Sequence, residues 1–146
     1  MIIDRQLLLS NNQAVTTTAV STNTIDLTVA RDIGIGEDLE LFVKVTTAFA
    51  SGTSLQFSYI TSPNSDLSAA NTIVSTPAIP TASLTAGTEW LRIRVPVLSM
   101  ASQIARYIGV AYTAVGTFTT GAVTAGIALD REGSVAYASG LGTTGF

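Results

Sequence analysis

The chain has 146 residues, the length of one ordinary domain, and contains neither cysteine nor histidine. These absences exclude disulfides, thiol nucleophiles, the usual general base near neutral pH and the commonest zinc ligand. Charged residues make up only 12% of the chain, about half the share usual in soluble domains, and the net charge is -3. This low share of charged residues predicts that other subunits cover part of the surface. We therefore expect an oligomer.

Thr, Val, Ile and aromatic residues dominate between short clusters of Gly, Pro, Ser and Asn, and no long stretch has an apolar stripe at helical spacing. This pattern is typical of an all-β protein. Candidate strands lie at residues 14–20, 24–29, 39–47, 54–61, 72–75, 89–95, 106–114 and 122–130. We therefore predict a single-domain jelly-roll β-sandwich of about eight antiparallel strands. Residues 65–70 could add one helical turn, with Ser65 or Asp66 as its N-cap.

The two ends of the chain fall outside these strands. We expect an N-terminal arm over residues 1–12, a jelly roll over 13–130 and a C-terminal arm over 131–146. Both arms are too apolar for free tails, so each should pack on a neighbour or on its own sandwich. The arm residues that we predict to contact a partner are Ile2, Ile3, Leu7, Leu8, Tyr137, Leu141 and Phe146.

Two predicted strands alternate clearly between apolar and polar residues. In the first, one face carries Leu39, Leu41, Val43 and Val45, and the other carries Glu40 and Lys44. In the second, Leu91, Ile93 and Val95 should point inward, and Trp90, Arg92 and Arg94 outward. Trp and Arg are enriched at binding hot spots, so the outward set is a candidate partner contact. The alternative is an ordinary surface pair of arginines beside a half-buried tryptophan.

Nucleic acid and membranes are not expected partners. Lys44 is the only lysine, whereas phosphate backbones are bound by clustered Lys and Arg. The uncharged stretch 107–129 is long enough to cross a bilayer, but its glycines and threonines predict two strands and a turn. Asp4 and Arg5 stand where a signal peptide needs its apolar core, which predicts synthesis in the cytoplasm.

No motif for catalysis stands out. Gly34-Ile35-Gly36 lacks the third glycine and the helix of a dinucleotide site, and is better explained as a tight turn. The carboxylates around it could hold calcium, although a solvated acidic loop is the simpler interpretation; they are Asp32, Glu37, Asp38 and Glu40. Walker and Gly-x-Ser-x-Gly motifs are absent from the sequence. We therefore expect no enzyme, no cofactor and no metal ion.

The run from Gln13 to Leu27, QAVTTTAVSTNTIDL, resembles the opening signature of the short capsid cement (decoration) proteins of tailed bacteriophages. The run 32–37, DIGIGE, is similar to that family's next element. Ala78-Ile79-Pro80 and the ending Ala128-Leu129-Asp130 match its order of features. The resemblance covers nearly the whole chain and is most specific in residues 13–41.

The resemblance implies a jelly-roll subunit that forms a homotrimer on the outer capsid surface and clamps neighbouring major capsid protein subunits together. It also implies a virion protein that is made in the host bacterial cytoplasm, and it transfers no catalytic residue. The alternative is a carbohydrate-binding or adhesin-type jelly roll, in which Trp90, Tyr107 and Tyr112 stack on sugars while the acidic turn holds calcium.

Overall fold

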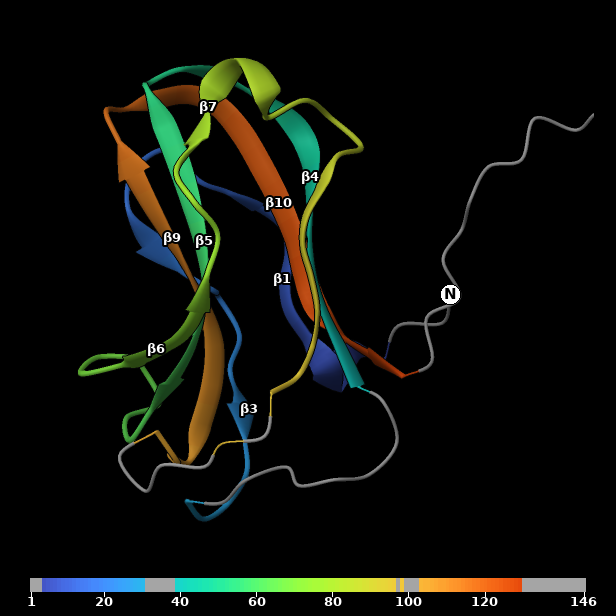
Figure 1. Cartoon of the computed structure of the whole chain (residues 1–146), viewed down its shortest axis with the longest axis vertical. Helices are drawn as coiled ribbons and strands as arrows, with labels where there is room; N and C mark the ends of the chain where they lie inside the picture. Colours follow the sequence, from blue (N-terminus) through green and yellow to red (C-terminus); the bar gives the residue numbers. More distant parts are fainter. Residues whose placement is uncertain (1–3, 31–38, 97, 99–102, 130–146) are drawn as a thin grey trace, which may run out of the picture.

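The computed structural model describes residues 4–30, 39–96, 98 and 103–129, which form two packed antiparallel β-sheets (Figure 1). The elements are η1 (Arg5–Leu7), β1 (Leu8–Ala14), β2 (Ala19–Val20), β3 (Ile25–Asp26), β4 (Leu39–Ser51), β5 (Ser54–Ser62), β6 (Asn71–Ser75), β7 (Ile79–Pro80), η2 (Thr81–Ser83), β8 (Glu89–Arg94), β9 (Tyr107–Val115) and β10 (Phe118–Leu129). The predicted all-β class is confirmed, and the stretch 107–129 forms two strands and a turn as expected.

The order of the strands is that of a jelly roll. One sheet has the order β1-β10-β4-β8; in the other, β9 and β5 are central, with β2 and β3 beside β9 and β6 and β7 beside β5. We count β2 and β3 as one strand, and β6 and β7 as one, which gives eight strands. The first of these eight then pairs with the last (β1 with β10), and the second with the seventh (β2 with β9). The third pairs with the sixth (β4 with β8), and the fourth with the fifth (β5 with β6). An antiparallel ribbon of that kind, rolled so that β10 pairs with β4 and β9 with β5, makes the predicted sandwich.

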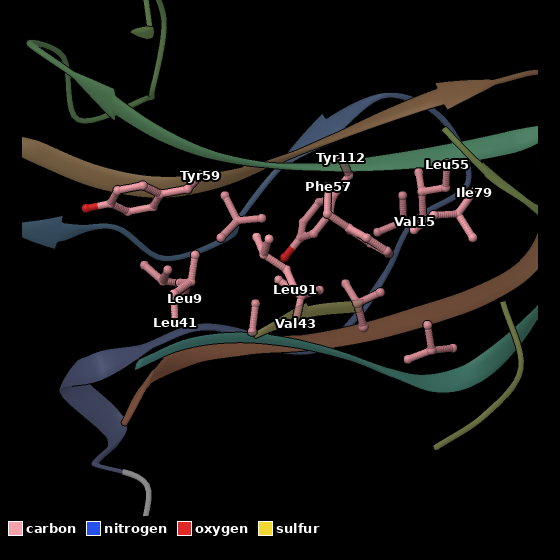
Figure 2. Packing of buried hydrophobic residues seen from close by; sticks show 14 of the residues in the cluster. Leu9, Val15, Leu41, Val43, Leu55, Phe57, Tyr59, Ile79, Leu91 and Tyr112 are labelled. Atoms are coloured by element: carbon pink, nitrogen blue, oxygen red, sulfur yellow. The ribbon is translucent and has the colours of Figure 1, made fainter. Parts of the chain in front are cut away.

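The inner faces of the two sheets form the hydrophobic core. Figure 2 shows Leu9, Leu41, Val43 and Leu91 of one sheet facing Leu55, Phe57, Tyr59 and Tyr112 of the other, and all of them are buried. The alternation predicted for β4 is confirmed, because Leu41, Val43 and Val45 are fully buried while Lys44 is exposed. Each such side chain contributes about 1.5–3 kcal/mol through removal of apolar surface from water.

The N-terminal part of the chain differs from the prediction. Residues 8–12 were predicted to lie in an arm outside the sandwich, but Leu8–Ala14 forms β1 at the edge of a sheet, and residues 15–18 separate β1 from β2. The reason is two register shifts in the pairing of β1 with β10, on either side of Ser10. Bulges of this kind interrupt the alternation of apolar and polar residues that a sequence pattern relies on.

Side-chain and backbone hydrogen bonds fasten β1 to the segment that follows it. Gln13 Nε2 donates to Val20 O at 2.8 Å, and Gln13 Oε1 accepts from Thr22 N at 2.9 Å. Asn23 N donates to Leu9 O at 2.9 Å, and Asn23 Nδ2 to Leu8 O at 3.2 Å. Two residues of the run that resembles the cement-protein signature therefore have a structural role, holding the edge strand in place.

The loop between β5 and β6 covers part of the outer face of the β5–β9 sheet. Leu67 is only 4% exposed, and a Cβ at Gly109 would come within 2.3 Å of Leu67 Cδ1. The predicted helical turn over 65–70 is wrong. Asp66 Oδ1 instead accepts hydrogen bonds from Ser68 N at 2.9 Å and Ser68 Oγ at 2.6 Å, a local alternative to helical bonding.

Two aromatic rings close the core at the end where the β4–β5 and β9–β10 turns lie, at the top of Figure 1. Phe49 and Phe118 meet edge to face, with their centroids 4.9 Å apart. A Cβ at Gly52 would lie 2.6 Å from the Phe118 ring, and one at Gly121 would lie 2.2 Å from the Phe49 ring. Both glycines have positive φ, and Gly52 in the β4–β5 turn and Gly121 within β10 can lie against the rings only because they have no side chain.

We predict that Gly121→Ala destabilises the fold far more than Gly87→Ala. Both positions have positive φ, but a Cβ at Gly87 would meet nothing within 4 Å. Gly87→Ala should therefore cost only the backbone strain, about 1–2 kcal/mol. Gly121→Ala adds a clash with Phe49, so the loss should be about 3 kcal/mol or more. Chemical denaturation measures both losses, and equal losses would show that the Phe49 ring does not lie against Gly121.

Candidate interaction surfaces

The predicted contact face lies on β8, the edge strand beside β4. Arg92 and Arg94 are exposed, and they lie opposite Phe42 and Glu40 of β4. Arg92 Nε donates to Glu40 Oε2 at 3.2 Å, with 42% and 26% of the two side chains exposed. An ion pair this exposed adds little to stability. Its effect is to hold the guanidinium group in a defined position on the outer face.

Trp90 does not point outward as predicted. The pairing of β8 with β4 shifts register between Val43 and Lys44, and this shift leaves Trp90 without an opposite residue. Trp90 is half-buried and packs against the core, and its indole Nε1 is buried without a hydrogen-bond partner among the described residues. Trp90 is therefore the half-buried tryptophan of the alternative stated above, and no exposed anchor beside the arginines.

Phe42 belongs to the same face, in a role that the alternation of β4 does not predict. Its position in the alternation is outward, yet it is only 2% exposed and lies opposite Gly126 of β10. A Cβ at Gly126 would lie 3.0 Å from Leu7 O and 3.4 Å from Phe42 Cε1. The glycine therefore lets the chain at Leu7 and the Phe42 ring pack on the outer face. The signal in the sequence was an apolar residue at a polar position of β4.

Only part of the two predicted arms is described. Leu7 is half-buried against the core, and Leu8 begins β1 opposite Gly126. Leu7 and Leu8 therefore pack on their own sandwich, which is one of the two alternatives expected for the N-terminal arm. The other arm residues predicted to contact a partner lie outside the described residues: Ile2, Ile3, Tyr137, Leu141 and Phe146.

The three aromatic residues of the carbohydrate-binding alternative do not form a shared exposed surface. Tyr112 is fully buried, and its hydroxyl lies 2.7 Å from Ser10 Oγ across the sandwich. Burial raises the pKa of Tyr112, while the bond to Ser10 acts in the opposite direction. The Tyr107 ring carries the Arg106 guanidinium 5.1 Å from its centroid, and Trp90 packs against the core. Tyr112 therefore cannot stack on a sugar.

The acidic turn is described only at its last residue. Glu40 is bonded to Arg92, whereas Asp32, Glu37 and Asp38 lie outside the described residues. Within the described ranges, no three His, Cys, Asp or Glu side chains gather as a metal site would require. The same ranges contain no helix with the length and apolarity needed to cross a membrane.

Asp26 and Arg106 form the best-defined ion pair of the described residues. Arg106 Nε and Nη2 donate to the two carboxylate oxygens of Asp26, each at 2.7 Å, which joins β3 to the start of β9. These bonds, with a further one from Thr28 N, lower the pKa of Asp26 from its ordinary 3.8 to about 2. The pKa of Asp66 is also lowered, but by the hydroxyl and N–H of Ser68.

We predict that Arg106→Gln raises the pKa of Asp26 toward 3.8 and leaves that of Asp66 unchanged. Because the folded-state pKa of Asp26 lies below its unfolded value, the ion pair stabilises the fold above about pH 4 and loses this effect as the pH falls toward 2. NMR titration of the side-chain carboxyl carbons measures both groups. An unchanged pKa of Asp26 in the variant would show that Arg106 is not the cause.

One comparison with known proteins found a family for the chain. The model of a protein family named Bbp16 matches residues 9–127, from the second residue of β1 to near the end of β10. No curated protein matches the chain. The match includes every strand of the jelly roll and the whole run that carries the resemblance to cement proteins. The chain belongs to the Bbp16 family.

Proposed function

We propose that this chain is a structural virion protein of a tailed bacteriophage: a capsid cement protein that forms a homotrimer and binds the outer surface of the major capsid protein shell. The observation that carries the proposal is the Bbp16 family match, because the family name suggests a phage protein and the match spans the strands that resemble cement proteins. The proposal involves no catalysis, cofactor, nucleic acid or membrane.

The fold supports a role in binding protein surfaces. Two sheets with a continuous core make a stiff body, and stiffness reduces the ordering cost of binding. A trimer offers three copies of each contact, so the first contact raises the effective concentration for the others. Modest contacts can then hold a rigid shell, and release requires them to break together. The outer face with Arg92 and Arg94 carries a residue type suited to such contacts.

The carbohydrate-binding alternative has less support. Sugar sites of the predicted kind need exposed aromatic faces near one another. Tyr112 is buried in the core and Trp90 packs against it, so two of the three aromatic residues are engaged elsewhere. We therefore do not propose it.

We predict that the purified protein binds expanded shells better than precursor shells and makes the expanded shells more resistant to heat. A ligand that prefers one state stabilises that state by mass action. Co-sedimentation with each kind of shell, followed by thermal melting, measures both effects. Equal binding to the two shells, or no binding, would contradict the proposal.

The same assay tests the β8 face. The double variant Arg92→Gln, Arg94→Gln should bind expanded shells about tenfold more weakly or worse, because it loses two exposed hydrogen-bonding cations. Arg106→Gln is the matched control, since Arg106 lies in the other sheet's ion pair with Asp26. Equal losses in both variants would remove the β8 face from the contact.

We also predict that the purified protein has three times the mass of a single chain in solution. The low share of charged residues is consistent with surfaces covered by other copies. Light scattering over a dilution series measures this mass directly. A monomer would contradict self-association, and a stable dimer would contradict the threefold assembly alone.

A further inference from the structure

Charge is distributed unevenly over the described part of the molecule. Four segments meet where the β4–β5 and β9–β10 turns lie, and we call this region the hairpin end: residues 15–18, 46–54, 76–88 and 113–121. None of them contains Asp, Glu, Lys or Arg. Asp26, Asp66 and Arg106 lie at the opposite end of the sandwich, and Asp4 and Arg5 lie at η1. The other described charges lie along β4 and β8: Glu40, Lys44, Glu89, Arg92 and Arg94, of which Glu89 directly follows the segment 76–88.

The hairpin end is a built surface whose four segments are bonded together. Phe118 N donates to Thr16 O at 2.8 Å, and Thr53 N donates to Val115 O at 2.8 Å. Thr81 N donates to Thr53 O at 3.1 Å. The Phe49 and Phe118 rings support the turns from beneath. Because the backbone is held in this way, the exposed side chains keep fixed positions, which favours binding without a large ordering cost.

The exposed side chains of this end are almost all small. They are mainly Thr, Ser and Ala, and they include Val115, which is 53% exposed. A Thr or Ser hydroxyl both donates and accepts hydrogen bonds, whereas a Lys or Arg only donates and a carboxylate only accepts. A hydroxyl surface can therefore form hydrogen bonds with an identical surface, which a surface of one charge type cannot do.

We infer that copies of this chain pack against one another through the hairpin end. In a rotationally symmetric assembly, residues near the axis meet the same residues of other copies. A charged residue there meets its own charge, which opposes association, whereas methyl and hydroxyl groups do not. The hairpin end satisfies this condition over four adjoining segments, and it lies apart from the charged residues Arg92 and Arg94 of β8. This inference rests on the self-association proposed above and names its surface.

The test compares two matched variants, Val115→Glu and Val29→Glu. Val29 is 58% exposed, close to the 53% of Val115, but it follows β3 at the opposite end of the sandwich. Val115→Glu places like charges together at the interface, so its dissociation constant should rise about tenfold or more while that of Val29→Glu stays at the wild-type value. Light scattering over a dilution series measures both, and circular dichroism with thermal melting shows that each variant is folded.

A second variant and a salt series keep the test decisive. Thr117→Glu charges the same end at another exposed position, and serves if Val115→Glu does not fold. Wild-type association should not weaken as the salt concentration rises, because the contact contains no charges. The inference is overturned if both hairpin-end variants assemble like the wild type, if Val29→Glu dissociates equally, or if the wild type is monomeric. Wild-type oligomers that depend on Val115 but do not bind shells would overturn the capsid role and leave this inference standing.

Discussion

The contact between Phe49 and Phe118 fixes the closed end of the sandwich, and much of the fold depends on it. The two rings come from β4 and β10, which pair along most of their lengths. The β4–β5 turn and the first part of β10 pass close to these rings, so Gly52 and Gly121 stand where a Cβ would clash with them. The turns that result bring together four uncharged segments. The shape of the hairpin end therefore depends on the closing of the core by an aromatic pair.

Polar groups hold the edge strand β1 in place. β1 pairs only with β10, and its bulges weaken the regular ladder. Gln13 and Asn23 compensate by bonding β1 to the chain that follows. Ser10 reaches the Tyr112 hydroxyl in the other sheet, so a buried polar contact also joins the two layers. Part of the run of sequence that resembles cement proteins thus fixes the first strand, which is a property of the fold.

Strands with strict alternation could be predicted from the sequence, and those with bulges could not. In β4, Leu41, Val43 and Val45 follow the period of two, and their burial agrees with it. In β1, the register shifts around Ser10 put apolar residues out of phase, so this strand was predicted as an arm. Trp90 was predicted to be exposed for the same reason. The roles of Phe42, Gly126 and Gly109 depend on neighbours distant in the chain, which no local pattern contains.

The described surface therefore includes two regions of different chemistry: an uncharged end formed by turns, and a charged face along β4 and β8. Such a division suits a protein that contacts its own copies with one region and a shell with another. Cryo-microscopy of expanded shells incubated with the purified protein tests most directly whether this jelly roll is a capsid cement protein. We predict ordered density for the sandwich on the outer shell surface, with β8 toward the major capsid protein. Shells that show no added density at a saturating concentration of the protein would contradict this role.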